Sequence, residues 1–381
     1  MANSYWVEPD LNLVKELKAL GGDTLKRCFQ CATCSVVCPI SPEEKPFPRK
    51  EMIAAQWGLR DKLVGNLDVW LCHQCNDCSA YCPRGARPGD VLNAVRAYSI
   101  KEYSWPSWAG TMVANPKRWW LLLGIPVAIF LVLLGAGGHL NIPDGEIEFA
   151  KFFPTLLVDA IFIPLTMWIM VAFGVGITRF LTDIHKNALA DGRAKREDLN
   201  IPDFLRTFVC TLPTILRHSK FSECSTNKDR YLAHILVMYS FIGLFVVTNV
   251  FFVALYILDI PGPYSQLNPV KILANVSGIG LLVGVLLMIS NRLKDREANV
   301  SKGGYFDWSL IILILGLVLT GGLSQLTRLA HVPGLAYPMY FVHLVFVFCL
   351  FAYLPFCKLA HLVYRTVAMT YSRYSEREPC E

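Results

Sequence analysis

The chain has 381 residues, of which 54% are hydrophobic and only 17% charged, and its net charge is +6. Soluble globular proteins carry about 25% charged residues, so this composition predicts that much of the chain contacts lipid. It excludes collagen-like, disordered and small disulfide-rich secreted proteins, and the modest charge gives no reason to expect a nucleic-acid partner.

Residues 1–105 contain no apolar run long enough to cross a bilayer, so we expect them to form a domain outside the membrane. Eight of the 13 cysteines lie there, between Cys28 and Cys82. The N-terminus lacks a basic stretch followed by an apolar one, so no cleaved secretory signal is expected. Cysteines gathered in a segment that is not exported indicate metal ligation rather than disulfides.

Two cysteine runs in this segment share the pattern Cys-x2-Cys-x2-Cys-x3-Cys-Pro, which is typical of cubane iron–sulfur clusters. Three closely spaced thiolates can wrap one loop around three irons, whereas the fourth, followed by proline, reaches the other cluster. Structural zinc usually has separated cysteine pairs, which complete runs do not resemble. We therefore predict two [4Fe–4S] clusters, one held by Cys28, Cys31, Cys34 and Cys82, the other by Cys72, Cys75, Cys78 and Cys38.

A helix is predicted between the two runs, over 48–63, where apolar residues recur at helical spacing. Pro48 near its start and Glu51 in its first turn are typical of a helix N-terminus. This pattern favours an all-helical ferredoxin domain. Without the signature of a substrate pocket, such a domain is expected to relay electrons.

Residues 106–381 are predicted to form a membrane domain, because uncharged apolar stretches of about 20 residues can cross a bilayer as helices. The predicted fold class is all-α, with a two-cluster ferredoxin domain followed by a six-helix transmembrane bundle of the cytochrome b type. The predicted spans are about 119–140, 155–179, 231–258, 270–291, 307–330 and 338–363.

Lysine and arginine flank these spans mainly on one side, in the segment 182–230, in the next loop on that side and in the tail. The opposite loops contain a single lysine, Lys151. Because cytoplasmic loops carry the excess of basic residues, both termini and the cysteine domain are predicted to lie on the cytoplasmic side of the inner membrane.

Histidine is rare in lipid and indicates function there. His343 and His361 lie on the last predicted span, five helical turns and about 27 Å apart, so a continuous helix would present one near each membrane surface. They are predicted to be axial ligands of two haem b groups, unless they are polar interface residues. His234, at the depth of His361, is the expected second ligand of the inner haem. His139 and His331 both qualify as partners of His343, with His139 preferred because it ends a predicted helix.

Asp159, near the outer end of the second span, is expected either to accept a proton from a quinol or to face lipid headgroups. The alternative quinone site lies on the cytoplasmic side near His218, which is otherwise expected at the interface rather than as a ligand. His73 and His185 are expected to be solvated loop residues.

At these residues the chain resembles known families. The paired cysteine domain resembles the C subunit of heterodisulfide reductase. Residues from about 231 to 366, with Ala233-His234-Ile235 and the ending Pro-Phe-Cys-Lys-Leu-Ala-His, resemble the cytochrome b subunit of respiratory nitrate reductase. The fusion is similar to the C-subunit family of the quinone-interacting membrane-bound oxidoreductase (Qmo complex) of sulfate-reducing organisms. The nitrate reductase family has a second histidine ten residues into its first haem helix; this chain has Leu244 there, so the fourth haem ligand is not carried over.

The resemblance implies a membrane subunit that oxidises menaquinol through b haems. It implies electron transfer through the two clusters to two cytoplasmic flavin and iron–sulfur proteins like the A and B subunits of the Qmo complex. The implied final acceptor is adenylylsulfate reductase, in dissimilatory sulfate reduction.

Other hypotheses are a heterodisulfide-reductase-like or sulfite-reduction-linked membrane subunit, a transporter with a redox-sensing domain and a non-redox membrane anchor. No further cysteine-rich motif follows Cys82, so this chain is not expected to act on a soluble substrate by itself. No internal repeat favours a transporter.

Overall fold

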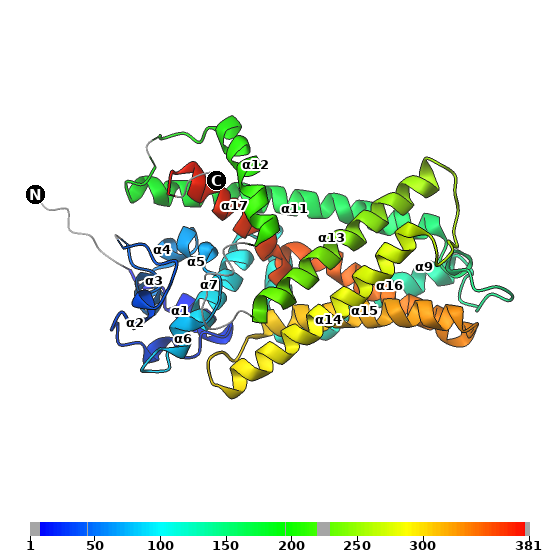
Figure 1. Cartoon of the computed structure of the whole chain (residues 1–381), viewed down its shortest axis with the longest axis horizontal. Coiled ribbons are helices and arrows are strands. Elements are labelled where there is room, and N and C mark those ends of the chain that lie inside the picture. The colour runs from blue at the N-terminus through cyan, green and yellow to red at the C-terminus, as the bar shows by residue number, and fades with distance from the viewer. Residues whose placement is uncertain (1–7, 44, 195, 219–228, 378–381) are drawn as a thin grey trace, which may run out of the picture.

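The computed structural model describes residues 8–43, 45–194, 196–218 and 229–377. Within these ranges all regular secondary structure is helical (Figure 1). Short helices from the first third of the chain gather at one end of the molecule, and long helices extend from them toward the other end. The predicted all-α fold is therefore confirmed.

The N-terminal domain is built from short helices around one longer helix. The cysteine loops leave only short segments that can form helices, so the helices beside these loops have four or five residues. The helices are α1 (Leu11–Ala19), α2 (Thr33–Val36), α3 (Arg49–Gln56), α4 (Arg60–Leu63), α5 (Leu67–Leu71), α6 (Asp77–Ala80) and α7 (Pro88–Tyr103), with a 3₁₀ turn at Leu25–Arg27.

The helix predicted over 48–63 is interrupted, because Gly58 adopts a φ of +68°. Glycine tolerates this left-handed backbone, and a Cβ there would lie 2.5 Å from the carbonyl oxygen of Asp10. The chain turns between α3 and α4, and Met52 and Leu63 both reach the same buried core. The apolar period was predicted correctly, whereas the continuity of the helix was not.

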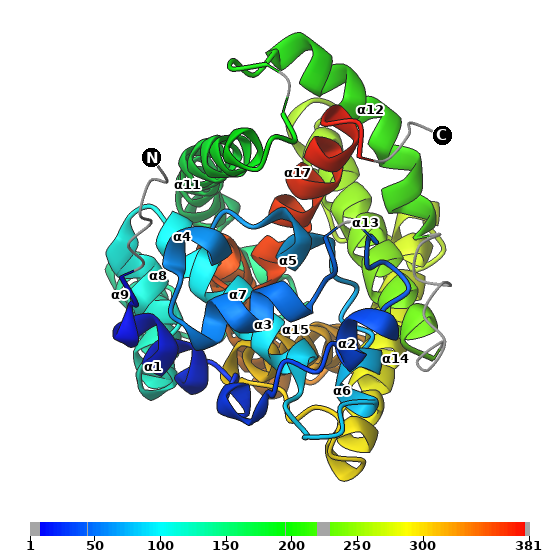
Figure 2. The ribbon, with the colours of Figure 1, turned by 90° about the vertical axis from the view of Figure 1, so that its left-hand side faces the viewer.

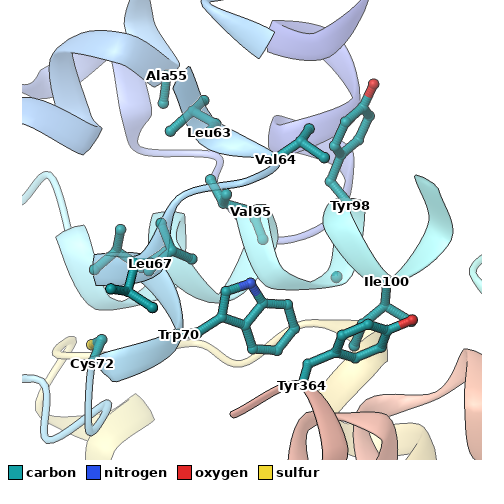
Figure 3. Close-up of a cluster of buried hydrophobic side chains, with 14 of the residues drawn as sticks. Ala55, Leu63, Val64, Leu67, Trp70, Cys72, Val95, Tyr98, Ile100 and Tyr364 are labelled. Atoms are coloured by element: carbon teal, nitrogen blue, oxygen red, sulfur yellow. The ribbon is translucent and has the colours of Figure 1, made fainter. Parts of the chain in front are cut away.

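One hydrophobic core joins the N-terminal domain to the long helices, with the fully buried Trp70 near its centre. Its indole lies 5.4 Å from the ring of Phe180 and 5.3 Å from that of Tyr364, measured between ring centroids. Figure 3 shows Tyr364 beneath Trp70, with Val95 of α7 on the other side. Since Phe180 and Tyr364 belong to the rest of the chain, the predicted boundary at residue 105 separates segments that share one core.

Six helices in the described ranges are long and apolar enough to cross a membrane, which agrees with the number predicted. Many of their leucine, isoleucine and valine side chains are exposed, as expected for a surface in lipid. They are α9 (Trp119–Ala136), α11 (Thr155–Ala190), α13 (Asp229–Tyr256), α14 (Pro269–Glu297), α15 (Tyr305–Leu329) and α16 (Pro333–Tyr353); shorter helices are α8 (Ser107–Val113), α10 (Phe149–Phe152), α12 (Ile201–Arg217) and α17 (His361–Tyr374).

The last predicted span, 338–363, is not one helix. After α16, two 3₁₀ turns, Leu354–Phe356 and Lys358–Ala360, lead to α17, which begins at His361. Pro355 lacks a backbone donor and clashes with the preceding helical turn, which accounts for the break. The expectation that His343 and His361 project from one face of a continuous helix is therefore wrong.

The basic segment predicted over 182–230 is largely helical where it is described. It begins inside α11 and includes α12, which packs along α17, where the Arg373 guanidinium donates to Thr214 Oγ1 at 2.9 Å. His185 was expected in a solvated loop, but it is buried on α11 with its Nδ1 2.8 Å from the hydroxyl of Tyr371. The correction follows from α17, which covers the C-terminal extension of α11 that the apolar pattern did not reveal.

Candidate functional site

The two cysteine loops adopt the same unusual backbone. Gln30 and Ala32 in the first loop, and Gln74 and Asn76 in the second, all have φ between +53° and +68°. Left-handed φ values are uncommon outside glycine, and these residues occupy equivalent positions of the two motifs. Each loop therefore curls tightly, which turns its three closely spaced cysteines toward a common point.

The first set of cysteines surrounds a cavity at the surface of the N-terminal domain, which we name the distal pocket. It is lined by Cys28, Cys31 and Cys34 from the first run and by Cys82 from the end of the second. The backbone N–H of Ala86 donates to Cys82 Sγ at 3.3 Å. Four thiols and a donor to sulfur suit a cubane cluster.

The second set surrounds a cavity nearer the long helices, the proximal pocket. It is lined by Cys72, Cys75 and Cys78 with Cys38 from the first run, so the fourth cysteine of each run lies at the pocket of the other. The N–H of Gln74 donates to Cys72 Sγ at 3.3 Å. These residues fit a second cluster equally well.

Burial distinguishes one thiol in each pocket, Cys34 and Cys38, from an ordinary cysteine. Burial raises the pKa of the Cys34 thiol to about 11 and that of Cys38 to about 12. Because metal ligation requires thiolates, loading of the pockets must release protons.

The loop of the proximal pocket is held by arginines from three separate helices. Arg96 of α7 and Arg365 of α17 both donate to the carbonyl oxygen of Cys72, at 2.5 and 2.8 Å. Arg230 of α13 donates to the carbonyl oxygen of Gln74 at 2.5 Å. Positive charge at this loop favours a group of net negative charge in the pocket.

A histidine pair lies next to the proximal pocket. The rings of His234 on α13 and His361 on α17 are 6.5 Å apart between centroids and nearly perpendicular. Metal–imidazole bonds of about 2 Å place the centres of two axial imidazoles about 6 Å apart. His361 Nδ1 lies 2.6 Å from the carbonyl oxygen of Lys358, which assigns the proton to Nδ1 and leaves the lone pair on Nε2, the atom that could bind a metal. The two histidines would therefore suit as the two protein ligands of one haem.

His218 also belongs to this group, because its ring lies 4.8 Å from that of His234. It caps α12 in a left-handed conformation, with a φ of +52°. The sequence favoured an interfacial residue and gave no sign of this contact, since α12 and α13 meet only in the folded chain.

A buried polar network joins the pocket loop to the histidines. The ammonium group of Lys358 contacts the carboxylate of Asp307 on α15, and it lies 3.4 Å from Gln74 Oε1. Asp307 also accepts from Arg292 of α14 at 3.0 Å and from Asn93 of α7 at 2.7 Å. Sequence reasoning missed this network; the signal that could have found it is a lysine three residues before a candidate ligand.

His343 points at the neighbouring helix α15, where its Nδ1 lies 3.1 Å from the carbonyl oxygen of Leu317. Its ring packs on Gly321, at which a Cβ would lie 2.9 Å from the imidazole. Among the residues that the structure describes, no ring contact joins His343 to His139 or His331. A second haem therefore stays a prediction.

Asp159 accepts a hydrogen bond from the hydroxyl of Tyr256 at the last residue of α13. His234 lies near the other end of α13, 22 residues earlier, which corresponds to about 33 Å. This separation is close to the thickness of a bilayer core.

His73 was expected to be solvated, but it is buried beside the proximal pocket, because the loop folds against the arginines that hold that pocket.

Comparison with known proteins adds two families. The 4Fe-4S dicluster domain family matches residues 24–86, and the Citrate utilization protein B family matches residues 183–380, just over half of the chain. The C subunit of the H(2):CoB-CoM heterodisulfide,ferredoxin reductase of Methanothermobacter marburgensis is 36% identical over 143 residues, or 37% of this chain and 68% of that protein. A protein of Archaeoglobus profundus that is like the heterodisulfide reductase C subunit is 34% identical over 105 residues, or 27% of this chain and 56% of its own. No solved structure matches.

Proposed function

The chain belongs to the family of the heterodisulfide reductase C subunit and, over residues 183–380, to the Citrate utilization protein B family, and on this premise we propose a quinone-linked function for it. Iron–sulfur electron transfer in a membrane oxidoreductase follows from the family and from the six apolar helices. The chain exchanges electrons between menaquinol and soluble flavoprotein partners on the cytoplasmic side. The basic loops support that side, and an even number of spans puts both termini on the same side.

Each cysteine pocket holds one [4Fe–4S] cluster. Cys28, Cys31, Cys34 and Cys82 are the ligands in the distal pocket, and Cys38, Cys72, Cys75 and Cys78 are those in the proximal pocket. The crosswise lining of the two cavities and the repeated left-handed turns support this assignment.

His234 and His361 hold a haem b, which supplies one-electron redox chemistry within the bilayer when it is bound. Lys358 orients His361 through its carbonyl oxygen, and Arg365, one turn after His361, contacts the proximal pocket. His343 is the proposed ligand of a second haem, with His139 or His331 as its partner.

Menaquinol is proposed to bind at the opposite end of α13, where Asp159 takes a proton. The hydrogen bond from Tyr256 and the position far from His234 support a role there. The cytoplasmic site near His218 is the alternative. The partners are two flavin and iron–sulfur proteins similar to the A and B subunits of the Qmo complex, with adenylylsulfate reductase as final acceptor.

A second candidate function is that of a heterodisulfide-reductase-like membrane protein, which the names of the relatives favour. This candidate differs from the first in its soluble partner, whereas the path of electrons inside the chain is the same in both. Both candidates depend on the same observation: the His234–His361 pair lies one helical turn from an arginine that contacts the proximal cysteine loop.

The experiment is a reduced-minus-oxidised visible spectrum of the full chain in detergent. We expect the spectrum to show a b-type signal. His234→Ala and His361→Ala should each remove the same component of that signal, whereas His343→Ala should leave that component unchanged. Iron and sulfide analysis is the folding control, since about eight of each should remain in all three variants. Absence of a b-type signal from protein that retains its clusters would refute the haem path.

A further inference from the structure

The distal pocket lies beside exposed side chains at the surface of the N-terminal domain. Cys31 is exposed, and so is Phe29, which lines the pocket and is 67% exposed. Val36 at the end of α2 is 83% exposed, and Tyr81 directly after α6 is 57% exposed. Figure 2 shows α2 and α6 facing the viewer, on the side away from the long helices. Aromatic groups exposed together indicate an interaction site rather than a solvated loop.

Basic side chains form the rim of this surface. The guanidinium of Arg84 lies 4.0 Å from the ring centroid of Phe29, and Arg49 donates to the carbonyl oxygen of Gln30 at 3.1 Å. Lys26 and Arg27 immediately precede Cys28, and both are exposed. The nearby carboxylate of Asp23 is already paired with the buried Arg87 at 2.5 Å. The rim therefore carries a positive charge that the carboxylate of Asp23 does not neutralise.

Protein interfaces are enriched in tyrosine, phenylalanine and arginine. A patch of one sign accelerates encounter with a partner of the other sign and orients it. The loop of the proximal pocket contacts Lys358 of the buried network, whereas Cys31 of the distal pocket is exposed. An electron would therefore leave the chain toward solvent from the distal pocket.

We propose that the surface of Phe29, Val36, Tyr81, Arg49 and Arg84 is the docking site of a soluble redox protein with an acidic face around its electron acceptor. This inference rests on the proposed function, because it needs an electron at the distal cluster. One electron leaves the reduced cluster and reduces the partner's acceptor by one; no bond forms and no proton moves.

Small oxidants test the charge of this outlet. The full chain, reduced with dithionite, is mixed with hexacyanoferrate(III) or with hexaammineruthenium(III), and cluster oxidation is followed at several salt concentrations. The anionic oxidant should react faster as salt is lowered and the cationic one slower. Arg84→Glu and Arg49→Glu should each reduce the anion-to-cation rate ratio by about tenfold at low salt, and Arg84→Gln by less.

Lys15→Glu is the matched control, because Lys15 is an exposed cation on α1, which lies apart from α2 and α6 in Figure 2. It should leave the rate ratio unchanged. Equal effects of Lys15→Glu and Arg84→Glu would overturn the proposal, since only overall charge would then matter.

Protein oxidants test docking itself. An acidic flavodoxin should saturate the oxidation rate at low concentration, whereas basic cytochrome c should not. Phe29→Ala and Tyr81→Ala should each raise the half-saturating flavodoxin concentration about tenfold. Tyr81→Ala, which does not line the pocket, should do so without altering the hexacyanoferrate rate. Unchanged flavodoxin kinetics in both variants would refute the docking site. Iron analysis separates this failure from that of the proposed function, because protein without clusters would fail before any oxidant is added.

Discussion

Glu51 on α3 is a carboxylate whose surroundings oppose its ionisation. Its side chain is fully buried, and burial followed by the neighbouring charge of Asp68 raises its pKa to about 7. For Asp68, burial also opposes ionisation, but Arg377 and Lys50 outweigh it and lower the pKa. Glu51 therefore ionises near neutral pH, whereas Asp68 is already charged there.

This carboxyl should make the stability of the fold depend on pH. The pKa of Glu51 is higher in the folded chain than the ordinary value of 4.5. The contribution of protonated Glu51 to the stability of the fold is therefore complete below pH 4.5 and is lost as the pH rises through about 7. The loss is roughly 3 kcal/mol. Glu51→Gln should therefore match the parent at pH 4 and exceed its melting temperature at pH 8.

Thermal unfolding in detergent at both pH values measures the difference. Glu43→Gln, at an exposed position of the same domain, is the control and should follow the parent. If Glu51→Gln loses stability with pH as steeply as the parent does, the raised pKa is not the cause.

Helices α13 and α14 pack closely because small residues line their contact. A Cβ on Gly284 would lie 2.8 Å from a methyl group of Val237 and 3.1 Å from its backbone nitrogen. Close approach through glycine is typical of helices in membranes. Since His234 lies one turn before Val237 on α13, this contact also determines where the imidazole stands.

Gly284→Ala should push the two helices apart. We expect a loss of about 1–3 kcal/mol of stability and a smaller or shifted haem signal from the His234 pair. Gly278→Ala, six residues earlier on α14, is the matched control because nothing lies within 4 Å of its added Cβ. Unfolding midpoints and visible spectra of both variants check the prediction, which fails if the two substitutions behave alike.

At the scale of the whole molecule, the buried carboxylate of Asp307 connects the cysteine domain to the membrane helices. It accepts from Asn93 of the domain and from Arg292 of α14, and it contacts Lys358 before α17. Breaking a buried ion pair leaves its partner charge without compensation, which costs more than the pair contributes.

Asp307→Asn should therefore destabilise the full chain by about 3–5 kcal/mol. The midpoint of denaturant unfolding measures this loss. Asp61→Asn serves as the control, since the side chain of Asp61 is 98% exposed and its carboxylate lies 3.9 Å from Arg60. Equal midpoints for the two variants would show that the network does not hold the two parts together.

The sequence by itself determined the features that depend on neighbours along the chain. Cluster binding follows from cysteines spaced within single loops, and the six spans follow from uninterrupted apolar runs, because both signals lie within about 25 residues of sequence. The predicted grouping of the fourth cysteines also followed from a local pattern, and the structure places Cys82 and Cys38 at the matching cavities.

Only the tertiary structure decided which distant groups meet. The contact of His218 with His234, the burial of His185 under α17 and the approach of Arg365 to Cys72 join segments that are 16 to 293 residues apart. Pro355 can be recognised in the sequence as a residue that breaks helices, but the direction of α17 after the break depends on the core around Trp70 and Tyr364. Packing of apolar surfaces is non-directional, so an apolar pattern predicts that a face is buried and leaves its partner to the fold.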